Sequence, residues 1–466
     1  MKEKFHYRPS TIKQFFGVRR NLADSEELLS SITTSSQEVE KNSLFIPLIG
    51  DRDGHDYIPD AIKRGVSLFL CKKNHPILKK LAPSDLQKAI FVNDTLSGLG
   101  ELGKFHRAHL DPFLIGITGS SGKTTTKEFF KLGVSYLNSI ATEKNYNNEI
   151  GVPFTIFSIK EENQVAVVEM GMNHSKEISR LTKIAMPSIA AITNVGPCHI
   201  ENLGSLKNIA LAKSEIIEGL SPSSAIFLPE DIHYKELFQK KANEYSVKIK
   251  YFSLKKSKLI RVLSKDREGF ELLLNGRKVR WNLPGDKLLE NLTCVLELLS
   301  FSGFDLNQSI ERILEYKPSY NRNVILRGTF TILDDCYNAN PDSMKSSLEI
   351  VKQVASGNRV IAILGDMLEL GKFSKRYHEE VGAYADELKI DSIICFGKDS
   401  KFFAKGFDKN SRKGLSCFED TNSSLKDLEV YLKNFCMEGD FVLVKGSRGM
   451  RMERIVEILK QIAGTK

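Results

Sequence analysis

The sequence predicts an α/β protein with three domains. The chain has 466 residues, and domains typically hold about 100–200 residues each. Apolar runs of strand length alternate with helical patterns along most of the chain, as they do when helices cover a largely parallel sheet. A glycine-rich loop between one such run and a helix begins the second of the three units, so we expect a phosphate-binding sheet at the centre.

The composition excludes several broad classes of protein. The hydrophobic fraction is 41% and the charged fraction 27%, which is typical of a soluble globular chain. We find no N-terminal signal and no apolar run long enough for a membrane span, so we expect a cytoplasmic protein without membrane contact. The seven cysteines are scattered and form no C-x-x-C pair. They indicate reduced, mostly buried thiols rather than a disulfide framework or a zinc site.

The formal net charge is +9, but its distribution does not indicate nucleic-acid binding. The lysines are spread out, and aromatic residues do not alternate with them. Much of the excess positive charge falls between residues 235 and 280, where we expect a solvated surface rich in hairpins. A mild positive field of this kind suits small polyanionic substrates.

Residues 1–110 are expected to form the first domain. A strand within 42–50, a helix over 59–65 and a strand over 66–71 give it α/β character, without a phosphate loop. Gly54, between Asp53 and His55, fits an ordinary turn and a functional loop equally well.

The second domain, residues 111–318, begins with the phosphate loop. A short buried strand over 111–115 leads into the run TGSSGKTT at 118–125, and a helical pattern follows from 127. Gly119 and Gly122 allow the backbone to come close to a phosphate, and Lys123 can reach the outer phosphates. The hydroxyl of Thr124 or Thr125 can hold a magnesium ion.

The match to G-x-x-x-x-G-K-[ST] is imperfect, because Ile117 stands where that pattern has its first glycine. The alternative is a Gly/Ser loop that carries a lysine by chance. The flanking strand and helix favour the phosphate loop, which by itself indicates nucleotide binding and no particular reaction.

Two further strands of this domain end in groups that can ligate a metal. Glu169 follows the apolar run 164–168, and His199 follows the run 188–193 after a short loop. Ligands collect at the carboxyl ends of strands in open α/β sheets, so both side chains are expected beside the phosphate loop. The alternative is that each is an ordinary loop residue.

Lys213 lies on the apolar stripe of the helix that follows His199, four residues after Ile209 and three before Ile216. A lysine on such a face usually extends its amine to solvent. A buried neutral lysine can instead react with carbon dioxide to form a carbamate, which would be an anionic oxygen ligand for a metal. The spacing alone does not decide between the two.

The rest of the chain predicts strands and turns over 221–281, a helix after 283, and a third domain over 319–466. Strands over 329–333, 359–364, 392–396 and 441–444 each end in polar residues, and a last helix follows. This pattern predicts a second largely parallel, Rossmann-like sheet. It has no phosphate loop, so we expect it to bind a second substrate or to close over the nucleotide.

These motifs together resemble the Mur ligase family, which makes the amide bonds of the peptidoglycan stem peptide. The resemblance rests on TGSSGKTT at 118–125, NYNNEIGVP at 145–153, EMGM at 169–172, NVGPCH at 194–199 and AKSE at 212–215. Two further runs, DDCYNANPDSM at 334–344 and LGDMLELG at 364–371, resemble members that add D-alanyl-D-alanine to UDP-N-acetylmuramoyl-tripeptide. Nearly the whole chain is covered, in the right order.

The resemblance implies an ATP-dependent ligase with an acyl-phosphate intermediate and two Mg²⁺ ions. It assigns the UDP-sugar to the first domain, ATP to the second and the incoming dipeptide to the third, in a protein that we expect to be monomeric. Thr124 and Glu169 would hold one ion, and His199 with a carbamylated Lys213 would help to hold the other. The residues expected to bind ATP are Gly119, Ser120, Ser121, Gly122, Lys123, Thr124, Thr125, Asn148, Asn291, Arg322 and Asp335.

The sequence departs from the family pattern at three places. Gln37 stands in the first-domain segment where the family often has Asp-Ser-Arg, and Lys287-Leu288 replaces His-Asn near the expected adenine site. Cys336 stands where most members have serine. The details of UDP and adenine binding are therefore open.

Three alternatives remain. A lysine- or diaminopimelate-adding ligase should show an Asp-Asn-Pro-Arg motif, which this sequence lacks. Folylpolyglutamate synthase shares the phosphate loop without the third-domain motifs. A non-catalytic nucleotide-binding protein would have no need of Glu169, His199 and Lys213 together.

Overall fold

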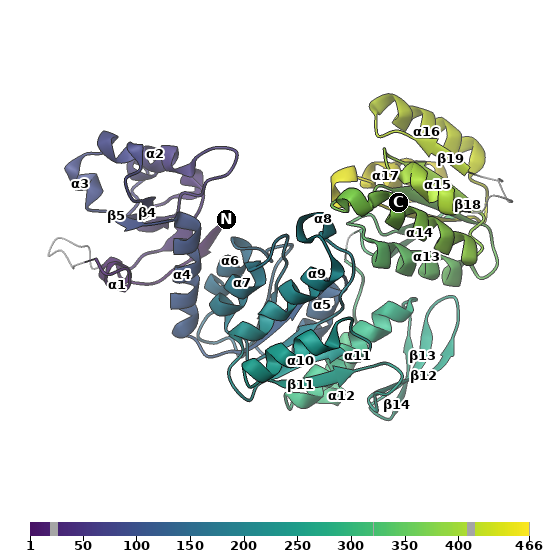
Figure 1. Ribbon diagram of the computed structural model, residues 1–466, viewed down its shortest axis with the longest axis horizontal. Coiled ribbons are helices and arrows are strands. Elements are labelled where there is room, and N and C mark those ends of the chain that lie inside the picture. The colour runs from purple at the N-terminus through teal and green to yellow at the C-terminus, as the bar shows by residue number, and fades with distance from the viewer. Residues whose placement is uncertain (19–26, 320, 408–414, 466) are drawn as a thin grey trace.

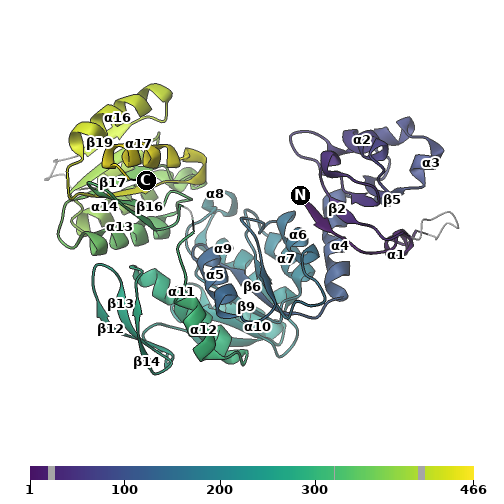
Figure 2. The same ribbon diagram turned by 180° about the vertical axis from the view of Figure 1, so that it is seen from behind.

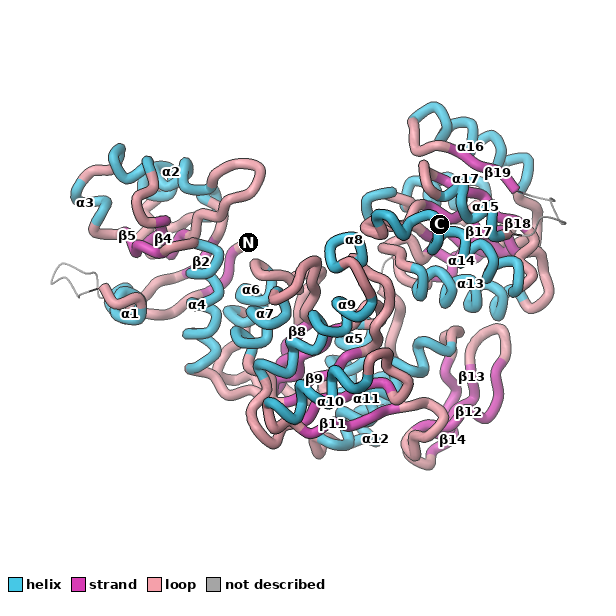
Figure 3. The backbone as a smooth tube through the Cα atoms, viewed as in Figure 1, coloured by secondary structure: helices cyan, strands magenta, loops and turns pink. Residues whose placement is uncertain are grey.

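The computed structural model describes residues 1–18, 27–319, 321–407 and 415–465. Figure 1 shows three bodies in chain order, and Figure 2 shows the same arrangement from behind. The tube in Figure 3 shows strands at the centre of each body with helices around them. The α/β fold class predicted from the sequence is therefore confirmed. In the described residues, no helix combines the length and the apolarity that a membrane crossing requires.

The N-terminal body contains a five-stranded sheet in the order β1-β2-β3-β4-β5, parallel except for the pair β1–β2. Its strands are β1 (Lys2–Lys4), β2 (Ser31–Thr33), β3 (Ser43–Phe45), β4 (Leu68–Lys72) and β5 (Ala89–Val92). Its helices are α1 (Pro9–Phe15), α2 (Ile58–Lys63), α3 (Pro83–Leu86) and α4 (Thr95–Ala108). The strands and the helix predicted from 42 to 71 are all present.

The central body contains a parallel six-stranded sheet in the order β11-β10-β9-β6-β8-β7. Its strands are β6 (Phe113–Thr118), β7 (Ser139–Ala141), β8 (Val165–Glu169), β9 (Ile189–Ile192), β10 (Ala225–Pro229) and β11 (Lys248–Phe252). Alternate residues of each strand face opposite sides, so Leu114 and Ile115 enter two different cores. Both faces are buried, which explains the continuous apolar runs in the sequence.

Helices cover both faces of the central sheet. One core contains α5 (Lys123–Gly133), α11 (Asp286–Phe301) and α12 (Leu306–Ile313). The other contains α6 (Gly151–Phe157), α7 (Glu177–Ala185), α9 (Leu206–Ser214) and α10 (Lys235–Glu244), with the short α8 (Ile200–Leu203) nearby. The expectation of only strands and turns over 221–281 is wrong at α10, because its buried apolar residues, Phe238 and Ala242, are too few to make a strong periodic signal.

A three-stranded antiparallel sheet completes the central body. It consists of β12 (Ile260–Lys265), β13 (Phe270–Leu274) and β14 (Arg277–Trp281), in that order. The turn between β13 and β14 contains Gly276 at φ 80°, a conformation that glycine adopts freely. The predicted hairpin is therefore present.

The C-terminal body contains a six-stranded sheet in the order β15-β16-β20-β17-β18-β19, parallel except for the edge pair β15–β16. Its strands are β15 (Val324–Arg327), β16 (Thr331–Asp334), β17 (Val360–Gly365), β18 (Ser392–Phe396), β19 (Leu415–Phe418) and β20 (Phe441–Lys445). Its helices are α13 (Pro341–Ala355), α14 (Ser374–Glu387), α15 (Phe403–Gly406), α16 (Asn422–Phe435) and α17 (Glu453–Ala463). This is the second parallel sheet that the sequence predicts.

The N-terminal and central bodies share packing along α4. Gly103 of α4 lies against Pro153 and Ile184, close enough that a Cβ there would come within 3.1 Å of the Ile184 side chain. Arg107 donates from Nε to the carbonyl of Ala185 at 2.9 Å. The core of the N-terminal body therefore continues into α6 of the central body.

Glycines lie where the central and C-terminal bodies meet. A Cβ on Gly196 would come within 1.9 Å of the Asp342 carboxylate, and one on Gly285 within 2.8 Å of Ile350. Gly371 lies in the same way against Glu201. At each point a side chain of one body packs directly on the backbone of the other, because glycine has no side chain of its own in the way.

All seven cysteines are free, and five of them are buried. The prediction of mostly buried thiols is therefore confirmed.

Candidate active site

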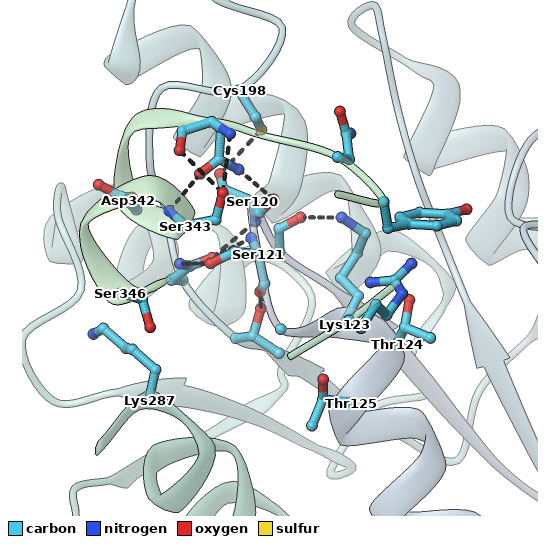
Figure 4. A pocket seen from close by; sticks show the side chains of 18 of the residues that line it. Ser120, Ser121, Lys123, Thr124, Thr125, Cys198, Lys287, Asp342, Ser343 and Ser346 are labelled. Atoms are coloured by element: carbon cyan, nitrogen blue, oxygen red, sulfur yellow. Dashed lines mark hydrogen bonds between the residues drawn. The ribbon is translucent and has the colours of Figure 1, made fainter. Parts of the chain in front are cut away.

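A pocket of about 350 Å³ lies at the carboxyl ends of β6, β8 and β9, between the central and C-terminal bodies. Most of the residues proposed from the sequence line it. They are Gly119, Ser120, Ser121, Gly122, Lys123, Thr124, Thr125, Glu169, His199, Lys213, Asn291, Arg322 and Asp335. Figure 4 shows the phosphate loop at the centre of this pocket.

The phosphate loop has the shape that the glycines predict. Gly119 adopts φ 157°, and a Cβ there would come within 1.8 Å of Thr193 Oγ1. Gly122, at φ 78°, is the N-cap of α5. The amides of the first turn of α5 therefore face the pocket, where the helix N-terminus favours an anion.

Asn194 supports the first half of the loop. Its Oδ1 accepts the backbone N–H groups of Ser120 and Ser121, each at 2.9 Å, and its Nδ2 donates to Ser121 Oγ at 2.6 Å. Gly122, Lys123 and Thr124 of the second half line the pocket. The sequence argument quoted Asn194 in a motif but gave it no role, because its partners are more than 70 residues away.

Thr124, Glu169 and Asn147 form one chain of hydrogen bonds. Thr124 Oγ1 donates to Glu169 Oε2 at 3.0 Å, and Asn147 Nδ2 donates to Glu169 Oε1 at 2.8 Å. The hydroxyl and the carboxylate that were predicted to share a magnesium ion are therefore neighbours. Hard oxygen donors of this kind suit Mg²⁺.

Lys123 folds back over its own loop. Its Nζ donates to the carbonyl of Gly119 at 2.8 Å, as the dashed line beside Lys123 in Figure 4 shows. A phosphate oxygen can replace this carbonyl as the acceptor.

Lys213 is only 1% exposed, yet it lines the pocket. Burial lowers its pKa to about 8, a nearby Cys198 opposes this shift, and the charge of Lys123 adds to it. No carboxylate in the described part of the chain pairs with Lys213. A large fraction of its amine is therefore neutral near pH 8, which is the form that reacts with carbon dioxide.

His199 lies at the start of α8, in a left-handed conformation with φ 53°. Its Nδ1 is 2.5 Å from Oε2 of Glu369, which belongs to the C-terminal body. The two atoms are in close contact, and the neighbouring ring stabilises the charged carboxylate, which lowers the pKa of Glu369 against the opposing effect of burial. We refer to Glu169, His199 and Lys213 as the pocket cluster.

The C-terminal body holds the phosphate loop through Asn340. This residue caps α13 by accepting the Ser343 N–H at 2.9 Å, and its Nδ2 donates to the Ser120 carbonyl at 3.2 Å. Asp342, in the first turn of α13, lies against Gly196 and lines the same pocket as Lys287 (Figure 4). Burial raises the pKa of Asp342.

Asp335 is held inside the C-terminal body rather than free in the pocket. Its Oδ2 lies 2.5 Å from Lys445 Nζ and accepts the Ser347 hydroxyl at 2.5 Å. Arg322 stacks on the Tyr337 ring, with 3.8 Å between the guanidinium carbon and the ring centroid. Arg322 and Tyr337 are both half-buried and both line the pocket, so the stacked pair forms part of its wall on this side.

Asn291 lies against the phosphate loop, since a Cβ on Gly122 would come within 2.5 Å of its Oδ1. Lys287 also lines the pocket and pairs with Glu290 of its own helix at 2.7 Å. Asn148 is not brought to the pocket: it is exposed, and its Oδ1 accepts the N–H groups of Ile150 and Gly151. Its neighbour Asn147 is the asparagine that reaches Glu169.

A second group of potential metal ligands, Asp53, His55 and His75, lies in the N-terminal body, with ligand atoms within 4.8 Å of one another. We call it the histidine cluster. His55 donates from Nδ1 to Asp53 at 2.7 Å and accepts the Lys72 N–H at Nε2, and His75 donates from Nε2 to Asp53 at 3.0 Å. His75 accepts the Ile77 N–H with its other nitrogen.

Because every ring nitrogen in the histidine cluster is used, the residues present do not fit a metal ion. A Cβ on Gly54 would come within 2.5 Å of the Leu48 carbonyl. The glycine therefore allows two backbone segments to approach closely here.

Two family models match the chain: the Mur ligase middle domain over residues 117–299 and the glutamate ligase domain of Mur ligases over residues 322–448. One relative is UDP-N-acetylmuramoyl-tripeptide--D-alanyl-D-alanine ligase from Bacillus subtilis strain 168, which is 32% identical to this chain. The alignment covers 95% of this chain and 96% of the relative. The chain belongs to the Mur ligase family. The resemblance seen in the sequence is therefore confirmed.

Solved structures of Mur ligases share the whole fold. MurF from Acinetobacter baumannii superposes with a TM-score of 0.83 at 26% identity, covering 98% of this chain and 99% of that one. MurF ligase from Thermotoga maritima in complex with ADP gives a TM-score of 0.80 at 25% identity, covering 93% of this chain and 97% of that one. The predicted three-domain arrangement of this Mur ligase is thus shared with both.

Proposed function

We propose that this Mur ligase joins D-alanyl-D-alanine to UDP-N-acetylmuramoyl-tripeptide at the expense of ATP. The product would be the pentapeptide precursor of peptidoglycan, made in the cytoplasm by a monomeric enzyme. The relative from Bacillus subtilis carries this activity in its name, and it aligns over nearly the whole chain.

The observation that carries the proposal is the position of Lys213. Lys213, which is buried and has no carboxylate partner in the described residues, lines the same pocket as the phosphate loop, Glu169 and His199. A protein that only binds a nucleotide has no need of Glu169, His199 and Lys213 together. A carbamate on Lys213 would convert this cation into an oxygen ligand beside His199.

The residues present fit two magnesium ions. Thr124 and Glu169 offer oxygen atoms 3.0 Å apart at one place, and His199 with a carbamylated Lys213 would hold the second ion. When bound, the ions would neutralise charge on the phosphates and on the reacting oxygens.

The chain itself orients the reactants. Lys123 and the α5 amides would hold the outer phosphates of ATP so that the tripeptide carboxylate can attack the γ-phosphate. Arg322, Asn291 and Asp335 surround the side of the pocket expected to take the rest of the nucleotide. The dipeptide amine would then attack the carbonyl carbon of the resulting acyl phosphate, forming the amide bond and releasing phosphate.

The domain roles follow from the same arrangement. We assign ATP to residues 111–318, the UDP-sugar to residues 1–110 and the dipeptide to residues 319–466. The pocket supports this division, because its walls come from the second and third of these units.

The first experiment is phosphate release from ATP and Mg²⁺ with UDP-N-acetylmuramoyl-tripeptide, with and without D-Ala-D-Ala. We expect release only with the dipeptide, together with a pentapeptide product. Release that requires lysine or diaminopimelate instead would assign another member of the family. Release with folate and glutamate would assign the polyglutamate reaction, and no stimulation by any substrate would leave a nucleotide-binding protein.

A further inference from the structure

Glu369 is the one residue of the LGDMLELG motif that reaches across to the central body's pocket cluster. Its Oε2 lies 2.5 Å from Nδ1 of His199, although the two residues are 170 positions apart and belong to different bodies. The His199 side chain is 25% exposed and that of Glu369 is 51% exposed. The proposed function does not yet use this carboxylate.

The backbone holds both partners in place. The carbonyl of Glu369 accepts the Glu201 N–H at 3.1 Å, which attaches the same residue to α8 a second time. Gly371 lies against the Glu201 side chain. Both His199 and Glu369 adopt left-handed conformations, at φ 53° and 63°, which direct their side chains at each other across the interface.

A carboxylate at Nδ1 determines which nitrogen of the ring can bind a metal. It favours the proton on Nδ1, so the lone pair is on Nε2. Within the described residues, nothing hydrogen-bonds to Nε2 of His199. Metal-binding histidines usually donate their other N–H to a carboxylate or carbonyl, which fixes the ring and makes it a stronger ligand.

We propose that Glu369 is a positioning residue: it orients His199 for the second metal ion, so that this ion binds tightly only when the C-terminal body is docked. The inference rests on the proposed function, since it takes His199 as a metal ligand. It adds a direct link between the body that would receive the dipeptide and the metal site. By reciprocity, an ion at His199 would stabilise the docked arrangement.

The test is a titration of the full-length protein with Mn²⁺ in the presence of UDP-N-acetylmuramoyl-tripeptide and an ATP analogue with a non-hydrolysable β,γ bond. Electron paramagnetic resonance counts the bound ions and gives the Kd of each. We expect two ions for the unchanged protein and one for His199→Ala. Glu369→Ala should raise the Kd of the second ion by about 10–100-fold, and Glu369→Gln, which keeps an acceptor without the charge, by less.

Glu429→Gln is the matched control, because it removes the same charge from the same body, where Glu429 pairs with Lys433 of its own helix. Its Mn²⁺ affinities should equal those of the unchanged protein. Small-angle X-ray scattering of each metal-loaded variant shows whether the C-terminal body is still docked. It therefore distinguishes a role of Glu369 in orienting the His199 ring from a role in only holding the two bodies together. Weaker binding of the second ion with an unchanged scattering profile supports the inference, whereas weaker binding only together with an expanded profile overturns it.

Two other outcomes would overturn the inference. If Glu369→Ala binds the second ion within twofold of the unchanged protein, the positioning role is wrong while the proposed metal site stands. If the unchanged protein and His199→Ala both bind a single ion, the second metal site itself is wrong, and the inference fails with it.

Discussion

The histidine cluster and the pocket cluster contain similar side chains, but they differ in how their hydrogen bonds are used. In the histidine cluster, backbone N–H groups and Asp53 occupy every ring nitrogen. In the pocket cluster, Lys213 has no carboxylate partner in the described residues. Neither ring nitrogen of His199 makes a hydrogen bond there, although Nδ1 lies 2.5 Å from Glu369. The comparison teaches that a gathering of ligand-type residues indicates a site only when some of their bonding capacity remains unused.

The largest expected effect is at Lys213. Lys213→Ala should lower kcat by on the order of 10³-fold, since loss of a metal ligand removes several kcal/mol of charge stabilisation. A short-chain carboxylate such as acetate should restore part of the activity by replacing the carbamate. Steady-state kinetics at rising acetate concentration checks this, and an inactive variant that no carboxylate restores would argue against the carbamate.

The next effect compares two neighbouring asparagines. Asn147→Ala removes the donor to Glu169 and should raise the Kd for the metal about 10–100-fold. Asn148→Ala should leave that Kd unchanged and lower the free energy of unfolding by about 1 kcal/mol, because Asn148 Oδ1 accepts the N–H groups of Ile150 and Gly151 at the start of α6. Mn²⁺ titration and urea unfolding measure the two quantities. A larger metal effect at Asn148 would restore the role first expected for it.

A third prediction concerns pH and the histidine cluster. Burial alone would raise the pKa of Asp53, but hydrogen bonds from the His55 N–H and from both rings lower it to about 2. Asp53 therefore stabilises the fold above its unfolded pKa of about 3.9, and this stabilisation is lost as the pH falls towards 2. Asp53→Asn should cost roughly 1–2 kcal/mol at pH 7, allowing for its partial exposure, and less at pH 3.

Urea unfolding of the N-terminal body, measured at both pH values, tests this prediction. A cost that does not change with pH would show that the charge of Asp53 contributes nothing. Added Zn²⁺ should leave the unfolding midpoint of the unchanged protein where it is, because the cluster has no unused ring nitrogen.

The smallest effect is expected at Lys287, a departure from the family pattern. Its charge is already paired with Glu290 on the exposed side of α11, and such pairs contribute about 0–1 kcal/mol. Lys287→Ala should therefore change the KM for ATP by less than about fivefold. A larger change would mean that Lys287 leaves Glu290 to contact the nucleotide.

Much of the fold could be predicted from local patterns. The continuous apolar runs of β6, β8 and β9 identify strands that are buried on both faces, and the glycines of the phosphate loop identify its turn. Helix α10 was missed because it is mostly polar and lies near the sheet edge, where few residues need to be apolar.

The site was predictable where a motif is local, and less so where partners are distant in sequence. Thr124 and Glu169 could be placed at one edge of the sheet because both follow the carboxyl end of a predicted strand. Which of Asn147 and Asn148 faces the pocket depends on the course of one loop, and neither residue lies in a periodic element. The contacts of Asn340 with Ser120 and of Glu369 with His199 depend on how two bodies dock, which no local pattern encodes.

The glycine at position 196 has a mechanical consequence. Its φ lies outside the left-handed region, so an alanine there is not strained, but the added methyl group would meet the Asp342 carboxylate. Because this carboxylate is the end of a flexible side chain, Gly196→Ala would turn it aside before the two bodies move apart. The variant would thus displace one charge at the boundary between the bodies and show which steps of the cycle need that charge in place and which need only the nucleotide.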